Sequence, residues 1–235
     1  MYFPNGFSRD DALACATLVD VDAFLAFRGT TSAWDGYMNS RFYQTDYAFA
    51  PDHGRVHDGF ANIYTLLRQQ VLDAVKALRS VSRLVFTGHS LGCALSSLAI
   101  PDVLRNSPPL LPKLHYNFAS PRVGDPQFAF KMNTSGVPTF RVVNTEDIVP
   151  ATPLPVSVWP SDLSTYLYKH IGTPIDFTAQ YDTIYNNHSL NIAYQYALTN
   201  PNNPEGPLPR LLRRASPVDA GALLPLQAIR VGQSA

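Results

Sequence analysis

One serine in the sequence occupies a setting that would make it a nucleophile. Ser90 stands in Gly88-His89-Ser90-Leu91-Gly92, between a short apolar run, 83–87, and a small-residue apolar segment, 93–104. We expect the run to be a strand and the segment a helix. A G-x-S-x-G sequence between a strand and a helix forces its serine into a strained backbone, lifts the hydroxyl above the sheet, and needs flanking glycines for so tight a turn. The pattern therefore predicts nucleophilic chemistry at Ser90.

A serine nucleophile needs a histidine base, because its hydroxyl is unreactive at its free pKa. On a strand-turn-helix scaffold the acid and then the histidine follow the serine along the chain. His188 follows the polar turn 185–187 and opens a predicted helix, 189–198. Its ring can then project from a loop over the strand ends, where ligands bind in open α/β sheets. We predict His188 as the base, with His170 as the alternative.

The acid that orients the histidine is expected just past the carboxyl end of a strand. The predicted strand 139–143 runs into the segment 144–150, where Glu146 and Asp147 compete. Side chains alternate there, so only one of the two points inward, and we choose Asp147. The alternatives, which can instead cap turns, are Asp125, Asp176 and Asp182.

Two backbone N–H groups must stabilise the oxyanion of a tetrahedral intermediate. One belongs to Leu91, the residue after the nucleophile. The other should come from an early strand-to-loop turn, and Gly29 and Thr30 follow the apolar run 23–26. We predict Thr30 as the second donor; the same residue can also cap the next helix.

The strands and helices that must position these residues alternate along the chain, as the spacing of apolar residues indicates. Apolar residues three to four positions apart predict a helix at 60–80, and we expect a further helix at 126–132, besides the one at 93–104. Strand-type runs lie at 14–19, 23–27, 83–87, 114–118 and 139–143. Alternation of this kind predicts an α/β fold with a mostly parallel central sheet flanked by helices.

Composition excludes several other classes of protein. Eighteen Lys and Arg balance eighteen Asp and Glu, so no broad cationic field is present and we expect no nucleic-acid partner. No stretch approaches the length of a transmembrane helix. Cys15 and Cys93 are the two cysteines and fit no metal spacing, so we expect no metal. The sequence does not indicate the oligomeric state.

Two segments bear on domain organisation and on the start of the chain. Residues 201–235 hold six prolines and no aromatic residue, so we predict a domain over 1–200 and a proline-rich tail over 201–235. The alternative is an extension that lies along the domain. Residues 1–11 lack the basic and apolar pattern of a secretory signal. We expect secretion if the N-terminus is processed or truncated, and a cytoplasmic protein otherwise.

Six segments resemble the class 3 lipases, the filamentous-fungal-type lipases of the α/β-hydrolase superfamily. In the family's order they are 26–30, 57–60, 88–92, 118–124, 144–150 and 188–190. Position by position, the resemblance implies Ser90 as nucleophile, Asp147 as acid and His188 as base, which favours Asp147 over Glu146. It also implies Thr30 and Leu91 at the oxyanion hole, and His57 as a structural residue near the site.

The chain departs from the family pattern at two places. Cys93 stands where the family usually has a second glycine, and we expect its thiol to pack against the sheet without a catalytic role. Only 25 residues precede the oxyanion motif, fewer than many members carry.

A lid is implied for the aromatic-rich segment 34–49, which holds six aromatic residues in 16. In the family this segment meets lipid when the lid is open. We assign the lid to 34–42, with these substrate or lid residues: Trp34, Tyr37, Met38 and Phe42. For 43–49 an ordinary core strand is the alternative.

The chemistry expected is transfer of an acyl group to water through an acyl-enzyme, with no metal or organic cofactor. We expect a triacylglycerol lipase acting on lipid or another ester, with transient contact between the lid and a lipid interface. The alternatives are a short-chain or feruloyl-type esterase, a phospholipase A1, and a non-catalytic lipid-binding scaffold.

Overall fold

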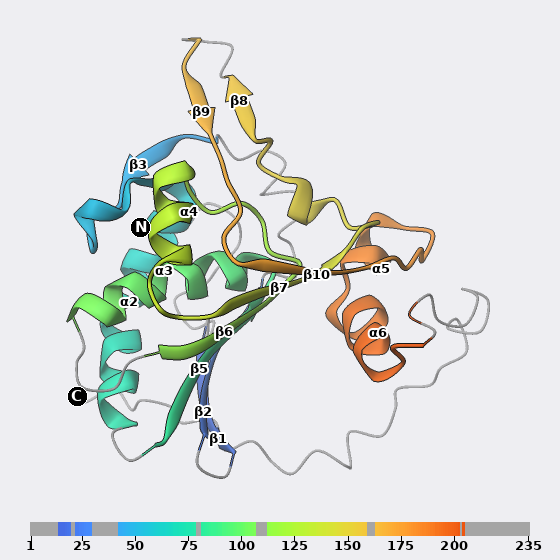
Figure 1. Cartoon of the computed structure of the whole chain (residues 1–235), viewed down its shortest axis with the longest axis horizontal. Helices are drawn as coiled ribbons and strands as arrows, with labels where there is room; N and C mark the ends of the chain where they lie inside the picture. Colours follow the sequence, from blue (N-terminus) through green and yellow to red (C-terminus); the bar gives the residue numbers. More distant parts are fainter. Residues whose placement is uncertain are drawn as a thin grey trace.

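A six-stranded sheet runs through the molecule (Figure 1). The computed structural model describes residues 14–19, 22–29, 42–78, 81–106, 112–158, 163–202 and 204. The strand order is β1-β2-β5-β6-β7-β10, and every neighbouring pair is parallel except β1 with β2. The strands are β1 (Ala14–Val19), β2 (Asp22–Phe27), β5 (Arg83–His89), β6 (Pro112–Phe118), β7 (Thr139–Asn144) and β10 (Thr173–Phe177). The predicted mostly parallel sheet is confirmed.

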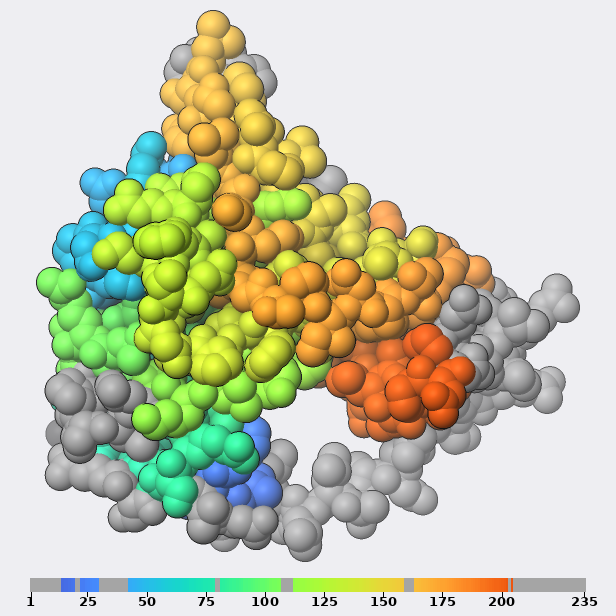
Figure 2. All heavy atoms as spheres, in the orientation of Figure 1, coloured from blue at the N-terminus to red at the C-terminus, as the bar shows by residue number. Residues whose placement is uncertain are grey.

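Two small antiparallel pairs stand apart from this sheet. They are β3 (Gln44–Asp46) with β4 (Arg55–His57), and β8 (Val156–Val158) with β9 (Thr165–Leu167). The second pair projects from the body of the molecule (Figure 2). Segment 43–49 therefore contains the short strand β3, and Tyr47 within the segment is buried. Both observations agree with the alternative interpretation of this segment as an ordinary core strand.

The helices agree with the sequence pattern to within a few residues, except near the C-terminal end. They are α2 (Asp58–Ala77), α3 (Leu91–Asn106), α4 (Pro126–Asn133), α5 (Ile184–His188) and α6 (Tyr196–Thr199), with single 3₁₀ turns η1 (Pro51–His53) and η2 (Val149–Ala151) and a π-helical turn η3 (Leu190–Gln195). The helix predicted over 189–198 is present as one continuous helical segment, but its first part is the π-helical η3 and only its last part is the α-helix α6. Of the described helices, none combines the length and apolarity that crossing a bilayer requires.

The main core lies between the sheet and helices α2 and α3. Leu84 and Phe86 alternate along β5 and join Leu95 and Leu98 of α3 in one buried cluster. Helix α3 packs on β2, β5 and β6, and α2 packs on α3. A central parallel strand is covered on both faces, which explains the continuous apolar run of β5.

A buried ion pair fixes α2 against α3. The Asp102 carboxylate is fully buried and accepts hydrogen bonds from Arg68 Nε at 2.8 Å, Arg68 Nη2 at 3.0 Å and the Tyr64 hydroxyl at 2.8 Å. A buried charge is tolerated when its oxygens are paired in this way. Helix α3, which begins directly after Ser90, is thereby held in place.

A second, smaller cluster lies beside the carboxyl end of β7. It joins Ala119 and Val142 to Tyr181, Ala193 and Tyr194 from the segment around α5 and η3. Figure 1 shows α5 and α6 at this end of β7 and β10. This packing brings the segment that carries His188 to the carboxyl edge of the sheet, where Ser90 and Asp147 lie.

Candidate active site

Ser90 stands in the turn between β5 and α3 with a left-handed backbone. Its φ is +58°, a conformation that costs free energy for any residue with a Cβ. The Ser90 N–H donates to Phe118 O at 3.0 Å, which ties the turn to β6. Gly92 lies so close to β2 that a Cβ there would overlap the carbonyl oxygen of Phe27. The predicted strained turn is therefore present, and its glycine is needed for close approach.

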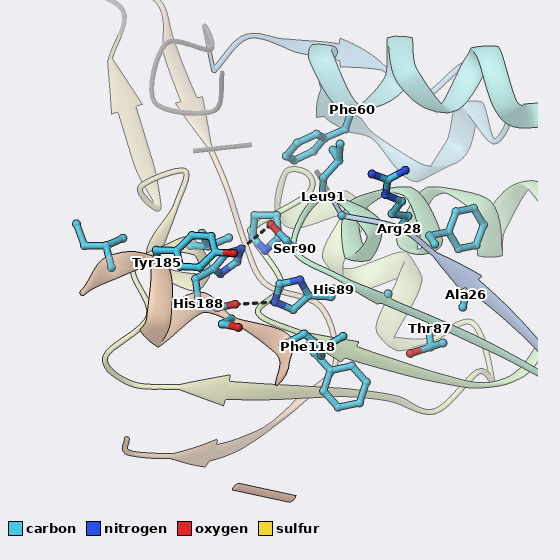
Figure 3. A pocket seen from close by; sticks show the side chains of 18 of the residues that line it. Ala26, Arg28, Phe60, Thr87, His89, Ser90, Leu91, Phe118, Tyr185 and His188 are labelled. Carbon is cyan, nitrogen blue, oxygen red and sulfur yellow. Dashed lines mark hydrogen bonds between the residues drawn. The ribbon is translucent and has the colours of Figure 1, made fainter. Parts of the chain in front are cut away.

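His188 is the last residue of α5, not a loop residue as the sequence analysis expected. The helix forms because Thr183 caps it, its hydroxyl accepting from Asn186 N at 3.0 Å. His188 Nε2 lies 2.8 Å from Ser90 Oγ, and His188 Nδ1 lies 2.8 Å from Asp147 Oδ2. The helix thus points the imidazole at the Ser90 hydroxyl, as Figure 3 shows, while its other nitrogen contacts the Asp147 carboxylate.

Asp147 lies in a turn that follows β7, and both of its oxygens are paired. Oδ1 accepts from Val149 N at 2.9 Å, while Oδ2 accepts from the Tyr194 hydroxyl at 2.7 Å as well as from His188. The carboxylate is almost completely buried. These bonds fix the position of the carboxylate, which in turn orients the imidazole.

The partners fix which nitrogen of His188 carries its proton. A carboxylate only accepts, so Nδ1 carries the proton and donates to Asp147. Nε2 is then the acceptor for the Ser90 hydroxyl proton. This arrangement of acid, base and hydroxyl is the one that activates a serine for attack on a carbonyl.

His89, the neighbour of Ser90, contacts both the backbone and the ring of His188. His89 Nε2 donates to His188 O at 2.8 Å, and the two ring centroids lie 4.7 Å apart. Burial, reinforced by the charge of His188, lowers the pKa of His89 to about 4. His89 therefore stays neutral near pH 7 and places no second positive charge beside the base. The G-x-S-x-G motif places His89 beside the nucleophile, but it does not predict the contact between His89 and His188.

A largely apolar cavity of about 810 Å³ opens at Ser90 and His188. Its wall comprises residues 26–29, 60, 87–91, 118, 121, 149, 183–185 and 188–190. Arg28 is the one Lys, Arg, Asp or Glu among these described residues. Such a cavity suits an uncharged, apolar ligand.

Leu91 lies at the cavity as the first residue of α3. The first N–H groups of a helix have no partner within the helix and point at its N-terminus, so they can bind an oxyanion. Thr30 lies outside the described residues, although its neighbour Gly29 lines the cavity. Over the described ranges, no three His, Cys, Asp or Glu side chains form a group that could hold a metal ion.

A protein-family model supplies the deciding comparison. The model described as Lipase (class 3) matches residues 24–157, which is more than half of the 235 residues. The chain belongs to the class 3 lipase family. The match includes Ser90 and Asp147, whereas His188 lies beyond it, so the position of His188 comes from the structure.

Individual relatives carry two kinds of name. The chain is 35% identical over 136 residues to a lipase of Rhizopus niveus, a match that covers 55% of this chain and 34% of that protein. It is 36% identical over 160 residues to phospholipase A1-II 3 of Oryza sativa subsp. japonica, covering 55% of this chain and 38% of that protein. The chain therefore spans little more than a third of the length of these curated relatives.

A solved structure resembles the chain in fold. It is a triacylglycerol lipase whose catalytic centre is a serine protease triad, and it matches with a TM-score of 0.55 and 28% identity. The match covers 69% of this chain and 64% of that one. The central sheet and its helices are accordingly an α/β-hydrolase fold.

The alternative candidates for acid and base lie elsewhere in this class 3 lipase domain. His170 Nε2 is 2.9 Å from Pro150 O, and burial lowers the pKa of His170 to about 3. The exposed Glu146 carboxylate accepts from Gln180 at 2.8 Å. Neither residue contacts Ser90 or His188 in the described contacts.

Other residues that the sequence singled out have these positions. Cys93 is fully buried and its Sγ donates to Gly88 O and Phe118 O at 3.0 Å each, which confirms that it packs against the sheet. Phe42 packs edge-on against the buried His57 and is not among the described residues that line the cavity. Three lid residues lie outside the described residues: Trp34, Tyr37 and Met38.

Proposed function

We propose that this chain is a serine carboxylic-ester hydrolase of the triacylglycerol lipase type. The observation that carries the proposal is the chain of hydrogen bonds from Ser90 through His188 to Asp147, at 2.8 Å for each step. It lies at the mouth of an apolar cavity in a member of the class 3 lipase family. No step of the chemistry requires a metal or an organic cofactor.

The geometry supports acyl transfer in two steps, formation of an acyl-enzyme and its hydrolysis. Ser90 Oγ attacks the ester carbonyl while His188 Nε2 takes the hydroxyl proton, and Asp147 stabilises the imidazolium that forms. The Leu91 N–H stabilises the oxyanion, together with the predicted second donor at Thr30. His188 then protonates the leaving alcohol, and water repeats the sequence on the acyl-enzyme.

The substrate class follows from the cavity. An acyl chain of a neutral lipid can pack against the apolar wall of the cavity without burying an unpaired charge. A charged ligand would find few polar partners there. The lid predicted at 34–42 would add transient contact with a lipid interface. A phospholipase A1 is the second candidate, because the relative from Oryza sativa carries that name. A short-chain or feruloyl-type esterase would use the same triad, and a non-catalytic lipid-binding scaffold would leave Ser90 inert.

Labelling and a substrate series test the proposal together. A fluorophosphonate probe should label the wild-type protein at Ser90, and Ser90→Ala should lose both labelling and about 10⁶-fold in kcat. The control is Ser82→Ala, an exposed serine ahead of β5, which should keep both. Over p-nitrophenyl esters of increasing chain length, kcat/KM should rise for a lipase and fall for a short-chain esterase. Esterase activity that survives in Ser90→Ala would overturn the assignment.

A further inference from the structure

Two buried asparagines flank the acid and the base in the sequence. Asn144 ends β7, three residues before Asp147, and Asn187 directly precedes His188. Asn144 is 0% exposed and Asn187 is 5% exposed. Burying an amide side chain costs free energy unless its donors and acceptor are paired. Their partners therefore show what the two side chains hold together.

The Asn144 amide links three separate backbone segments. Nδ2 donates to Ala179 O at 2.9 Å and to Asn187 O at 3.1 Å. Oδ1 accepts from Ala179 N at 2.9 Å and from Glu146 N at 3.3 Å. All four hydrogen-bonding positions of the amide are used, and one of them reaches the residue before the base.

The Asn187 amide makes the reciprocal contact. Nδ2 donates to Glu146 O at 3.2 Å, on the residue before the acid, and to Gln180 Oε1 at 2.9 Å. Oδ1 accepts from Tyr181 N at 2.7 Å. Each asparagine side chain thus binds the backbone of the segment that carries the other. We call Asn144 and Asn187 the asparagine clasp.

We propose that the asparagine clasp positions the acid against the base for ester hydrolysis, a proposal that rests on the proposed function. Asp147 and His188 come from segments 41 residues apart, and neither residue belongs to the sheet that aligns the strands. An error of about 1 Å in the position of a catalytic group can cost about 100-fold in rate. The clasp joins the two segments one residue away from each group, and neither asparagine is among the described residues that line the cavity.

The side-chain amide is the chemical group that this position requires. A donor must face the carbonyl oxygens of Glu146 and Asn187, while an acceptor must face the N–H groups of Ala179 and Tyr181. A carboxylate would supply only acceptors, and an aliphatic side chain would leave buried backbone groups unpaired.

Alanine variants with a matched control separate positioning from general stability. Asn117 is the control, because it is also 0% exposed and its amide binds Ser96 Oγ and Ser97 Oγ on α3, away from the segments of Asp147 and His188. Asn144→Ala, Asn187→Ala and Asn117→Ala should all lower Tm. We expect only the first two to lower kcat for a soluble p-nitrophenyl ester, by about 30-fold or more, with KM within about 3-fold of wild type.

The pH profile adds a readout that lost stability alone would not move. The base works through its contact with Asp147, so a looser contact should move the acid limb of kcat/KM away from its wild-type position in both clasp variants. The downfield ¹H NMR signal of the His188 Nδ1 proton should weaken or move with it. Asn117→Ala should change neither measurement. Clasp variants that lose Tm like Asn117→Ala but keep kcat and the acid limb would overturn the proposal.

A milder substitution covers the case in which the alanine variants do not fold. Asn187→Asp keeps the size of the side chain and the acceptor for Tyr181 N, but turns an oxygen toward Glu146 O. A loss of kcat without a rise in KM supports the clasp, and wild-type kcat overturns it. Failure of the proposed function looks different: the wild type would then neither hydrolyse esters nor react with the fluorophosphonate, while the Nδ1 proton signal would still report on the clasp.

Discussion

The Tyr194 hydroxyl donates at 2.7 Å to the same Asp147 oxygen that accepts from His188 Nδ1. Tyr194 OH in turn accepts from the backbone N–H of Asn144 at 3.2 Å, so the phenol joins the acid to the end of β7. Burial and the nearby Asp147 carboxylate raise the pKa of Tyr194, which keeps the phenol protonated as a donor. Asp147 is therefore held in place by a residue in η3 as well as by its own turn.

Tyr194→Phe should reduce turnover without changing substrate binding. The variant removes one hydrogen bond to a buried carboxylate and frees the carboxylate to rotate away from His188. We expect kcat to fall about 10-fold with KM nearly constant, since a hydrogen bond to a charged group contributes about 1.5–3 kcal/mol. Steady-state kinetics on a soluble ester measure the effect.

Tyr181→Phe is the matched control for this prediction. Tyr181 is as deeply buried, packs in the same apolar cluster, and its hydroxyl has no hydrogen-bond partner among the described residues. Its phenylalanine variant should keep wild-type kcat and at least wild-type Tm. Equal losses in the two variants would show that bulk packing, and not the bond to Asp147, accounts for the effect of Tyr194.

Gly92→Ala should destabilise the protein far more than Gly136→Ala. A Cβ at position 92 would overlap the Phe27 carbonyl and push α3 away from β2, which we expect to cost about 3 kcal/mol or more. At Gly136 a Cβ would meet open space, so only its φ of +82° opposes the substitution, at about 1–2 kcal/mol. Urea unfolding gives both values. A Gly92→Ala variant as stable as Gly136→Ala would contradict the close approach of α3 to β2.

The elements that the sequence predicted well are those with strong local patterns. The apolar run of β5, the three-to-four spacing of α2 and the glycine-flanked serine each carry their signal within a few residues. Strand β10 had no such signal, because Thr173 to Ile175 are exposed and no alternation marks a buried face. It is a strand because it pairs in parallel with β7 at the edge of the sheet.

The candidate site divides in the same way. Ser90, Asp147 and His188 could be chosen from motif order, but the contacts that hold Asp147 and His188 together join residues 41 to 50 positions apart, which no local pattern reports. The type of the helix predicted after His188 could not be foreseen for a related reason. A π-helical turn replaces its first part, and Tyr194 within that turn contacts Asp147, a tertiary interaction that spacing alone does not encode.

The two cysteines should differ sharply in reactivity. Cys15 is exposed on β1, whereas burial raises the pKa of the Cys93 thiol well above its usual range. Only a thiolate reacts with a maleimide, so the native protein should take up one equivalent and the denatured protein two. Mass spectrometry of proteolytic fragments assigns the label. Labelling of Cys93 as fast as Cys15 under native conditions would mean that α3 opens readily at its first turn.

Acid should unfold the protein through its buried histidines. Burial lowers the pKa of His57 and His89 to about 4 and that of His115 and His170 to about 3, against an ordinary value of 6.5. Between these values the unfolded chain binds more protons than the folded one, so stability falls as the pH falls.

The free energy of unfolding should therefore be greatest above about pH 6.5 and decline toward pH 4, each histidine adding about 1 kcal/mol per pH unit to the slope. Urea titrations at a series of pH values measure this dependence. His115→Gln, which removes a fully buried imidazole between Ser96 and Thr139, should lower stability near pH 7 and flatten the slope below pH 6. An unchanged slope in that variant would show that His115 does not resist protonation in the folded protein.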